Sequence, residues 1–452
     1  MLEVTLAGAT RGHRASSLIT QLRDAIRAGS LRAGTRLPAS RTLATDLGVS
    51  RGVVVRAYEQ LTAEGYLHAQ QGRGTEVAAA PPPIEPGPRP PARPASNPGL
   101  PAGSLFPRAA WLRSVTRALA QLPDADLSYG DPAGHPRLRN ELSAYLGRVR
   151  ALIAPPEHIV VVNGFAQASR LLADVLVGRG TSHIGVEDPG SVGLRDQLTQ
   201  AGATCVPVPV DGDGIRVDHL ARTGLRSVVV TPAHQFPTGV VLSPERRHAL
   251  LRWAHDTGGL VIEDDYDAEL RYDRAPVGAL QGLGPDVVIH GGSVSKTLAP
   301  ALRLGWLVLP ERLVGAVTAA KYATDLATST LDQSILADFL ASGEMDRHVR
   351  RTATRCRTCR DALVTAIATH LPEWTVTGTA AGLHLVVHPR PDRSETALAT
   401  LAQRCGLDAR PLSGYAIRDL DRAGLVIGYG HQRPDELTRN VVELAHHIDL
   451  IR

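Results

Sequence analysis

The sequence contains almost no lysine. Of its 49 basic residues, only Lys296 and Lys321 are lysine and the other 47 are arginine. A partly desolvated lysine can lose its proton and form a Schiff base with a carbonyl, whereas a guanidinium stays protonated. The alternative is that a GC-rich coding bias makes lysine rare and that both survivors are accidental. Lys321 lies in a predicted helix without phosphate donors in its motif, so we expect it to be an ordinary surface amine.

Cysteine and long apolar runs are also scarce. The four cysteines are too few and too scattered for a disulfide framework. Cys356 and Cys359 form a CxxC motif inside a predicted helix, but no second ligand pair accompanies it, so we expect no metal site. No apolar run approaches the roughly 18 residues that cross a bilayer, and no signal-peptide pattern opens the chain. We therefore expect a globular cytoplasmic protein without membrane contact.

Positive charge is concentrated near the N-terminus. Residues 1–77 contain ten arginines and six acidic residues, whereas residues 104–452 contain 37 basic and 38 acidic residues. This asymmetry is typical of a nucleic-acid-binding head on a neutral body. The segment 79–103 is rich in proline, which predicts a semi-rigid polyproline linker rather than an ordered surface loop. The sequence therefore predicts a head (1–78), a linker and a body.

The head has the pattern of three helices and a hairpin. Apolar residues recur at helical spacing over 18–26, Ser40 can cap a second helix, and a third helix covers 51–63. Residues 67–77 read as a β-hairpin with a glycine-containing tip. Together these elements predict a mostly α-helical winged helix-turn-helix.

Four segments of the head keep a specific spacing. They are Leu37-Pro38-Ala39-Ser40-Arg41, Leu47-Gly48-Val49-Ser50-Arg51, Glu64-Gly65-Tyr66-Leu67 and Gly72-Arg73-Gly74-Thr75. With them the head resembles the winged-helix domain of GntR-type bacterial transcription regulators. The resemblance implies binding to double-stranded promoter DNA, with Arg41 on a phosphate and Arg51 opening the recognition helix. An arginine on a glycine-tipped wing, here Arg73, can enter a narrow minor groove. For Arg41 the alternative is a solvated surface charge. The candidate DNA contacts are Arg41, Ser50, Arg51, Arg73 and Gly74.

Beyond the linker, strand-like apolar runs alternate with helical segments. The clear runs are 159–162, 228–231, 260–263, 287–289 and 305–309. Long connections separate them, which predicts an α/β domain with a mostly parallel sheet and helices on both faces. From about residue 345 we expect a smaller α+β subdomain, with strands at 382–387 and 425–429.

Lys296 follows a predicted strand that ends in carboxylates. Asp264 and Tyr266 belong to that strand end and share one of its faces. A carboxylate there can pair with a protonated pyridine nitrogen, and a tyrosine can hydrogen-bond a phenolate oxygen. Ser293 and Arg303 flank the lysine as phosphate donors, and we expect the lysine pKa to be lowered. Taken alone, Asp264 is explained as well by a buried structural role.

With these residues in register, residues 104–452 resemble a fold-type I aminotransferase, and the whole chain resembles the MocR subfamily of GntR regulators. The resemblance implies that pyridoxal 5'-phosphate (PLP) is bound to Lys296, with Asp264 on the pyridine nitrogen and Tyr266 on the phenolic oxygen. It also implies a homodimer and a phosphate site made of Ser293, Arg303, the backbone of Gly164, Phe165 and Ala166, and Tyr129 of the partner subunit. The segment 231–239 matches the family's loop over the ring.

Two departures from the family pattern concern the substrate. Ser191 stands where many relatives carry an aromatic residue that stacks on the ring. The segment 424–429 lacks the arginine with which aminotransferases clamp a substrate carboxylate, and Arg410 or Arg418 are the open alternatives. We therefore expect a regulator that senses PLP or its amino-acid adduct as a small-molecule effector. The alternatives are an active PLP-dependent aminotransferase with a DNA-binding appendage, and a regulator that has lost its cofactor.

Overall fold

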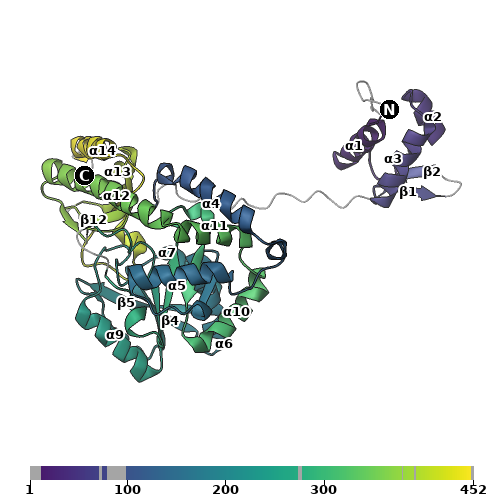
Figure 1. The fold of residues 1–452 in the computed structure, drawn as a ribbon. Helices are drawn as coiled ribbons and strands as arrows, with labels where there is room; N and C mark the ends of the chain where they lie inside the picture. Colours follow the sequence, from purple (N-terminus) through teal and green to yellow (C-terminus); the bar gives the residue numbers. More distant parts are fainter. Residues whose placement is uncertain are drawn as a thin grey trace. The chain divides into compact units, whose positions relative to one another are not determined.

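The computed structural model describes residues 12–70, 74–78, 98–272, 277–378, 380–390 and 393–448. The chain forms two compact units, Met1–Arg93 and Pro94–Arg452, which are described separately below (Figure 1). Most of the predicted linker, residues 79–97, lies outside the described residues. No helix of the described segments is both long and apolar enough to cross a membrane.

The N-terminal unit contains α1 (Arg14–Arg27), α2 (Ser40–Asp46), α3 (Arg51–Ala63), β1 (Leu67–Gln70) and β2 (Gly74–Val77). The two strands are antiparallel, with Leu67 opposite Val77. Leu18, Leu22 and Leu61 are fully buried between the helices, because apolar residues spaced by four lie on one helix face. The predicted winged helix-turn-helix is confirmed.

One detail of the predicted head is wrong. Ser40 does not cap α2: it is the first helical residue, and Ala39 occupies the N-cap position without a side-chain hydrogen bond. The Ser40 hydroxyl instead faces the Nε of Arg51 at 3.5 Å. The starts of α2 and α3 therefore lie side by side.

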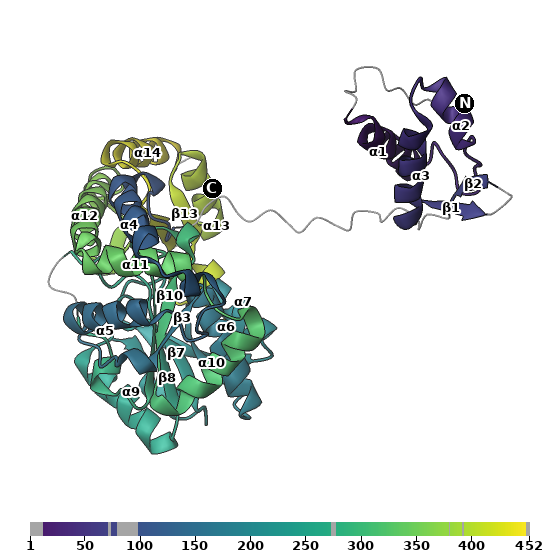
Figure 2. The ribbon, with the colours of Figure 1, turned by 45° about the vertical axis from the view of Figure 1, so that its right-hand side comes forward.

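The large domain of the second unit is built around one mixed sheet (Figure 2). Its strands are β3 (Ile159–Val162), β4 (His183–Asp188), β5 (Thr204–Asp211), β6 (Gly214–Ile215), β7 (Ser227–Val230), β8 (Leu260–Asp265), β9 (Val288–Ser293) and β10 (Gly305–Val308). Their order is β3-β10-β9-β8-β7-β4-β5-β6. Strands β5, β4, β7, β8 and β9 are parallel, whereas β10 is antiparallel to both β3 and β9, and β6 to β5.

Helices cover both faces of this sheet. They are α4 (Arg108–Gln121), α5 (Pro136–Arg150), α6 (Phe165–Gly178), α7 (Val192–Gln200), α8 (Val217–Leu220), α9 (Pro244–Thr257), α10 (Glu311–Asp325) and α11 (Thr330–Ala341). Val160 and Val162 of β3 pack in the cluster that contains α6, α7 and α10, while Ile159 and Val161 pack in the cluster that contains α4, α5 and α11. Side chains alternate along a strand, so a continuous apolar run fills both layers.

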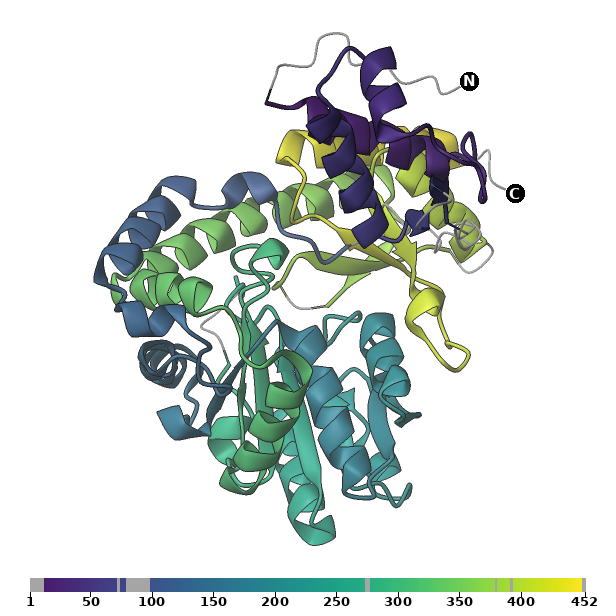
Figure 3. The ribbon, with the colours of Figure 1, turned by 90° about the vertical axis from the view of Figure 1, so that its right-hand side faces the viewer.

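The smaller subdomain lies at one end of the large domain, to which α11 and α12 connect it (Figure 3). Its elements are α12 (Glu344–His370), β11 (Thr375–Thr377), β12 (His384–His388), α13 (Glu395–Arg404), β13 (Asp408–Pro411), β14 (Leu425–Gly428) and α14 (Pro434–His447). The strands form an antiparallel sheet in the order β11-β12-β14-β13. The predicted α/β domain with a smaller α+β subdomain is confirmed.

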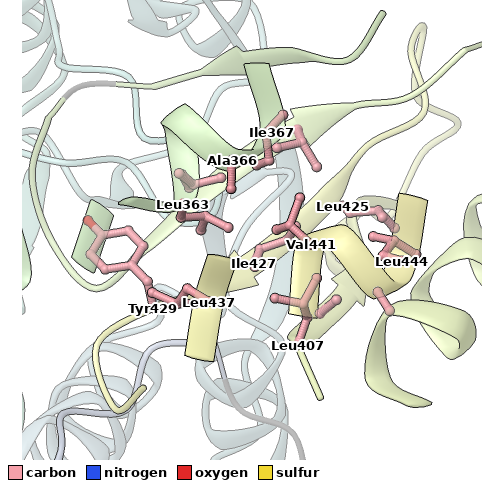
Figure 4. Packing of buried hydrophobic residues seen from close by; sticks show 14 of the residues in the cluster. Leu363, Ala366, Ile367, Leu407, Leu425, Ile427, Tyr429, Leu437, Val441 and Leu444 are labelled. Atoms are coloured by element: carbon pink, nitrogen blue, oxygen red, sulfur yellow. The ribbon is translucent and has the colours of Figure 1, made fainter. Parts of the chain in front are cut away.

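The CxxC cysteines belong to the core of this subdomain. Leu363 and Ile367 of α12 pack with Ile427 of β14 and with α14 (Figure 4). Cys356 and Cys359, one to two turns earlier on α12, are free thiols buried in the same cluster. Burial raises the pKa of Cys356 to about 12, so this thiol stays protonated and behaves as a small apolar group.

Candidate functional site

The predicted cofactor residues meet at one edge of the large sheet. Asp264, near the end of β8, pairs with Gly291 of β9. Gly305, the first residue of β10, pairs with Ser293 at the end of β9 and with Val162 at the end of β3. Because β10 runs against its neighbours, its start lies beside their ends, and residues far apart in sequence reach the same edge.

A candidate anion site lies at this edge, where the N-terminus of a helix meets an arginine. Gly164 is the N-cap of α6 and has φ +78, and a Cβ added to it would lie 3.0 Å from the Nη2 of Arg303. Arg303 donates from Nη2 to the carbonyl of Asn163 at 2.6 Å. The first N–H groups of α6, at Phe165 and Ala166, have no acceptor within the helix. A helix N-terminus beside a guanidinium is suited to hold a phosphate.

Lys296 lies in the turn that follows β9. Its side chain is partly buried, and burial lowers its pKa against the opposing charges of Asp267 and Asp264. The expected lowering is therefore present, but its cause is burial and not the nearby Arg303. A Cβ added to Gly99 would lie 3.3 Å from the Nζ of Lys296. The end of the predicted linker thus passes directly against the lysine.

The position of residues 98–100 also explains why two positions near the last strand, β14, are glycine. A Cβ on Gly428 would lie 2.6 Å from the backbone of Pro98, and a Cβ on Gly430 would lie 2.9 Å from the carbonyl oxygen of Leu100. Both approaches are too close for a side chain. The segment 424–429 lacks the arginine that aminotransferases carry there. Its last strand, β14, packs instead against residues 98–100 at the end of the linker.

The adjacent carboxylates Asp264 and Asp265 have different surroundings. Asp265 binds the buried guanidinium of Arg150 at 2.8 Å and the imidazole of His290 at 2.9 Å, so it belongs to a structural network. Burial raises the pKa of Asp264 well above its usual value, and the charges of Asp265 and Asp267 raise it further. A cationic ring nitrogen at Asp264 would offset this cost. Of the two, Asp264 is the one suited to a pyridinium.

A buried polar cluster surrounds the hydroxyl of Tyr266. We call it the Tyr266 network, and it consists of Tyr266, His234, Asp267 and His384. The Nδ1 of His234 lies 2.9 Å from Asp267 Oδ2 and 3.1 Å from the Tyr266 oxygen. His384, the first residue of β12, donates from Nε2 to the carbonyl of Pro237 at 3.2 Å. The network joins the 231–239 loop, the end of β8 and the small subdomain.

Sequence reasoning missed most of this network. His234 was recognised only as part of a matching loop, and neither Asp267 nor His384 was singled out. Asp267 follows Tyr266 directly, but β8 ends at Asp265, so strand alternation does not predict where its side chain points. A histidine directly before the apolar residues Leu385, Val386 and Val387 was the available signal for His384.

The sequence departs from the family pattern at two places, and the residues named there make other contacts. Ser191 caps α7, because its hydroxyl accepts from the N–H of Leu194 at 3.3 Å. Arg418 forms an ion pair with Asp188 at 3.0 Å. Arg410 lies on β13 opposite Val426. An ion-paired Arg418 is a poor clamp for a substrate carboxylate.

Lys321 corrects one expectation. It is not a surface amine, because its side chain is fully buried and its Nζ forms an ion pair with Asp325 at 2.8 Å. Asp325 also accepts from Asn163 Nδ2 and from Gln167 Nε2, both at 2.7 Å. The second lysine of the chain therefore supports the loop that precedes α6.

Tyr129 lies on the surface of the single chain. Its side chain is 86% exposed in the single chain, and the nearby Leu127 is 64% exposed. Tyr322 and Leu326, at the end of α10, are also exposed. A side chain this exposed is available for contact with a second molecule.

Three of the five candidate DNA contacts, Arg41, Ser50 and Arg51, lie at the starts of α2 and α3. Arg41 and Arg51 are exposed, and within the described ranges no carboxylate forms an ion pair with either. Ser50 is the N-cap of α3, and Gly74, with φ +93, begins β2. Arg73 lies outside the described residues.

Two family models match the chain. The model for bacterial regulatory proteins of the gntR family matches residues 14–77, and the model for class I and II aminotransferases matches residues 102–424. The "probable rhizopine catabolism regulatory protein MocR" of Rhizobium meliloti is 34% identical over 454 residues, which cover 94% of this chain and 92% of the relative. The chain is a MocR-type regulator of the GntR family.

Other relatives agree with this membership. The pyridoxine biosynthesis transcriptional regulator PdxR of Corynebacterium glutamicum is 33% identical, with 97% of each chain covered. Among solved structures, an archaeal alanine:glyoxylate aminotransferase superposes with a TM-score of 0.72 at 26% identity, covering 78% of this MocR-type chain and 90% of the enzyme. The regulator therefore carries a complete aminotransferase-like body behind its winged helix.

Proposed function

We propose that this MocR-type regulator binds promoter DNA through its winged helices and responds to PLP, or to its adduct with an amine, in the aminotransferase-like body. The observation that carries the proposal is the arrangement around Lys296. Burial lowers the pKa of both lysines, but Lys321 is held in an ion pair with Asp325, whereas Lys296 lies beside Asp264 and the anion site. A bound PLP would supply an electrophilic carbonyl and an electron-withdrawing ring.

The residues present fit this cofactor at each of its polar groups. The anion site at Gly164 and Arg303 suits the phosphate, and Asp264 suits the ring nitrogen. Tyr266 suits the phenolic oxygen, because burial and nearby carboxylates raise its pKa and keep its hydroxyl protonated. Lys296 would hold the carbonyl carbon. These roles are proposed for the chain's own residues.

The surroundings of the site favour sensing over turnover. The segment 98–100 lies against Lys296 and β14, where aminotransferases place a carboxylate-binding arginine. Arg418 is paired with Asp188. A ligand that forms at Lys296 would press on the end of the linker, and this contact gives a direct route from the site to the DNA-binding unit. The same contact would hinder an incoming amino acid in an enzyme.

We also propose that two copies of the chain form a homodimer in which Tyr129 reaches the phosphate site of the partner. The exposure of Tyr129 and of the apolar side chains near it supports this arrangement. Light scattering should find a dimer, and Tyr129→Phe should weaken PLP binding without changing the mass. A monomer that still binds PLP tightly would contradict the proposal.

The decisive experiment compares DNA binding with and without PLP. The full-length protein is titrated onto the intergenic DNA beside its own gene, by fluorescence anisotropy, before and after loading with PLP. We expect a visible absorption band on loading and a changed affinity for that DNA but not for random DNA. Rapid conversion of amino donors by the loaded protein, without any effect on DNA binding, would instead support the aminotransferase.

A further inference from the structure

Asn163, which opens the loop before α6, is held at three of its polar groups. Its backbone N–H donates to Gln167 Oε1 at 2.8 Å, and its carbonyl accepts from Arg303 at 2.6 Å. Its side-chain Nδ2 donates to Asp325 Oδ2 at 2.7 Å. We call residues 163–166 the anion loop, because they lead into the N–H groups at the start of α6 that have no acceptor within the helix. The anion loop is therefore held by contacts from both α6 and α10.

The ion pair of Lys321 and Asp325 determines how the Gln167 amide is oriented. An ammonium only donates hydrogen bonds, and a carboxylate only accepts them. The Nζ of Lys321 lies 3.5 Å from Gln167 Oε1, and Asp325 Oδ2 accepts from Gln167 Nε2 at 2.7 Å. The amide oxygen of Gln167 is thereby kept on the side where the Asn163 N–H needs an acceptor. With the opposite orientation of the amide, this N–H would lose its partner.

This ion pair is placed unfavourably for the helix that carries it. Asp325 is the last residue of α10, where a negative charge opposes the helix dipole. A lysine four residues before the acidic residue is also the weaker of the two possible orders. Burying such a pair seldom stabilises a fold more than apolar side chains would. Helix stability therefore does not explain the pair, whereas its contacts with the anion loop do.

The chain leaves α10 in a strained turn directly after Asp325. Leu326 has φ +64 and ψ −62, and the Ala327 N–H donates to the Asp325 carbonyl at 2.7 Å. This is a γ-turn with positive φ, which is rare and costly for a residue other than glycine. Such strain persists only where the surrounding structure determines the conformation. The position of Asp325 is therefore constrained by the helix before it and by the turn after it.

Lys321 also balances the charge behind the anion loop. A carboxylate close to an anion site would repel a phosphate, and more strongly in buried surroundings than in water. The ammonium of Lys321 lies 2.8 Å from Asp325 Oδ1 and offsets that charge. The pair thus supplies one fixed acceptor to two amides without adding net negative charge near Arg303 and the start of α6.

We propose that Asp325 and Lys321 are positioning residues that hold the anion loop in its ligand-binding conformation before a phosphate group arrives. The inference rests on the proposed binding of PLP, and it assigns this pair to the recognition of the phosphate and not of the ring. Gly164 has φ +78 and ψ 173, a conformation that is open essentially to glycine alone, and glycine is the most flexible residue. A loop that is held in place by its neighbours binds an anion without the cost of ordering it first.

The test compares PLP with pyridoxal, which has the same ring and aldehyde but no phosphate. Both are titrated onto the full-length protein and followed by the visible absorption band. Asp325→Ala removes the acceptor of both amides, so we expect PLP to bind about tenfold more weakly, while the affinity for pyridoxal stays within about twofold. A general loss of structure would weaken the binding of both ligands alike.

Further variants make the test independent of how well Asp325→Ala folds. Gln167→Leu removes the linking amide without leaving a buried charge, and we expect the same selective loss of PLP affinity. The double variant Lys321→Met, Asp325→Asn removes both charges but keeps an amide oxygen as acceptor, so its PLP affinity should lie within about threefold of the wild type. Asp174→Ala, which breaks the Arg170–Asp174 pair on α6, is the control and should change the binding of neither ligand.

Inorganic phosphate gives a second readout that does not involve the ring. We expect it to raise the Tm of the PLP-free wild type, and to raise the Tm of Asp325→Ala and Gln167→Leu less. Equal stabilisation of all variants by phosphate would overturn the positioning role, as would losses of affinity that are the same for PLP and pyridoxal. A wild type that shows no absorption band with PLP would overturn the proposed function. A wild-type band combined with equal losses would overturn only the role of Asp325 and Lys321.

Discussion

In the winged-helix unit the candidate arginines are exposed and close together in sequence, whereas in the aminotransferase-like body the candidate residues are buried to varying degrees and come from distant strands. Arg41 and Arg51 are separated by a short turn and need only two helices to present them. Asp264 and Gly164 need the whole sheet, with β10 running against its neighbours. Substitutions in the head should therefore change binding alone, while those in the body should change binding and stability together.

The same contrast applies to charge. The guanidinium groups of Arg41 and Arg51 remain hydrated until DNA replaces water. Asp264 is held in a site that disfavours its charge, so the folded protein without a ligand carries an energetic cost. The site around Asp264 favours a bound ligand, because without the ligand its polar groups lack hydrogen-bond and charge partners.

The largest effect is expected at the two lysines. Lys296→Ala should abolish the visible absorption band of the PLP-loaded protein, because no other described amine lies at the site. Borohydride reduction of the loaded wild type should fix pyridoxyl on Lys296 and leave Lys321 unmodified. Peptide mapping by mass spectrometry measures both.

Lys321→Ala is the matched control, although we expect it to have a small effect on PLP binding. Its band should persist, but Asp325 would lose its ion pair beneath the loop of Asn163, and PLP should bind a few-fold more weakly. Basal DNA affinity should stay unchanged in both variants, because the head is a separate unit. Pyridoxyl on Lys321, or on neither lysine, would contradict the cofactor assignment.

The second effect concerns the head. Arg51→Ala should remove about 1–3 kcal/mol of discrimination between promoter and random DNA. That loss corresponds to about five- to 150-fold in relative affinity. Arg41→Ala should weaken both DNAs alike and reduce the salt dependence by about one counterion. Anisotropy titrations at several salt concentrations measure these effects, and equal losses on both DNAs for both variants would be inconsistent with the assignment.

A third effect tests the cost of the buried carboxyl. The folded-state pKa of Asp264 is raised, so the folded chain holds the proton more tightly than the unfolded chain, and stability falls as pH rises above the unfolded value of about 4. Asp264→Asn should therefore raise the Tm of the PLP-free protein at neutral pH. It should also weaken PLP binding about tenfold or more, because a charge-assisted hydrogen bond contributes about 1.5–3 kcal/mol. A lower Tm without PLP would show that the carboxylate stabilises the empty fold.

These differences also explain what the sequence could predict. The helix over 51–63 and the strand 159–162 were predicted with their observed limits, because local periodicity and spacing determine them. The strands β4 and β5 were missed, since glycine and proline interrupt their apolar pattern. Apolar periodicity was therefore sufficient to predict features that a single helix or strand forms.

The site was predictable only in part, for a related reason. Asp264 and Ser293 lie at strand ends and Lys296 follows one, and these strand ends share an edge. The residues next to Lys321 predict a surface amine, because its partner, Asp325, lies one helical turn further along the sequence. His384 comes from another subdomain, and no spacing within the sequence connects it to Tyr266.

The smallest effect is expected where the linker meets the body. Gly99→Ala would place a Cβ 3.3 Å from the Nζ of Lys296, so the two groups must separate by a few tenths of an ångström. We expect PLP to bind a few-fold more weakly and the PLP-dependent change in DNA affinity to shrink, while DNA affinity without PLP is unchanged. Gly103→Ala is the matched control, since a Cβ there meets no atom within 4 Å. If both variants respond to PLP like the wild type, the contact at Lys296 does not transmit the signal to the linker, and the route to the winged helices must begin elsewhere in the body.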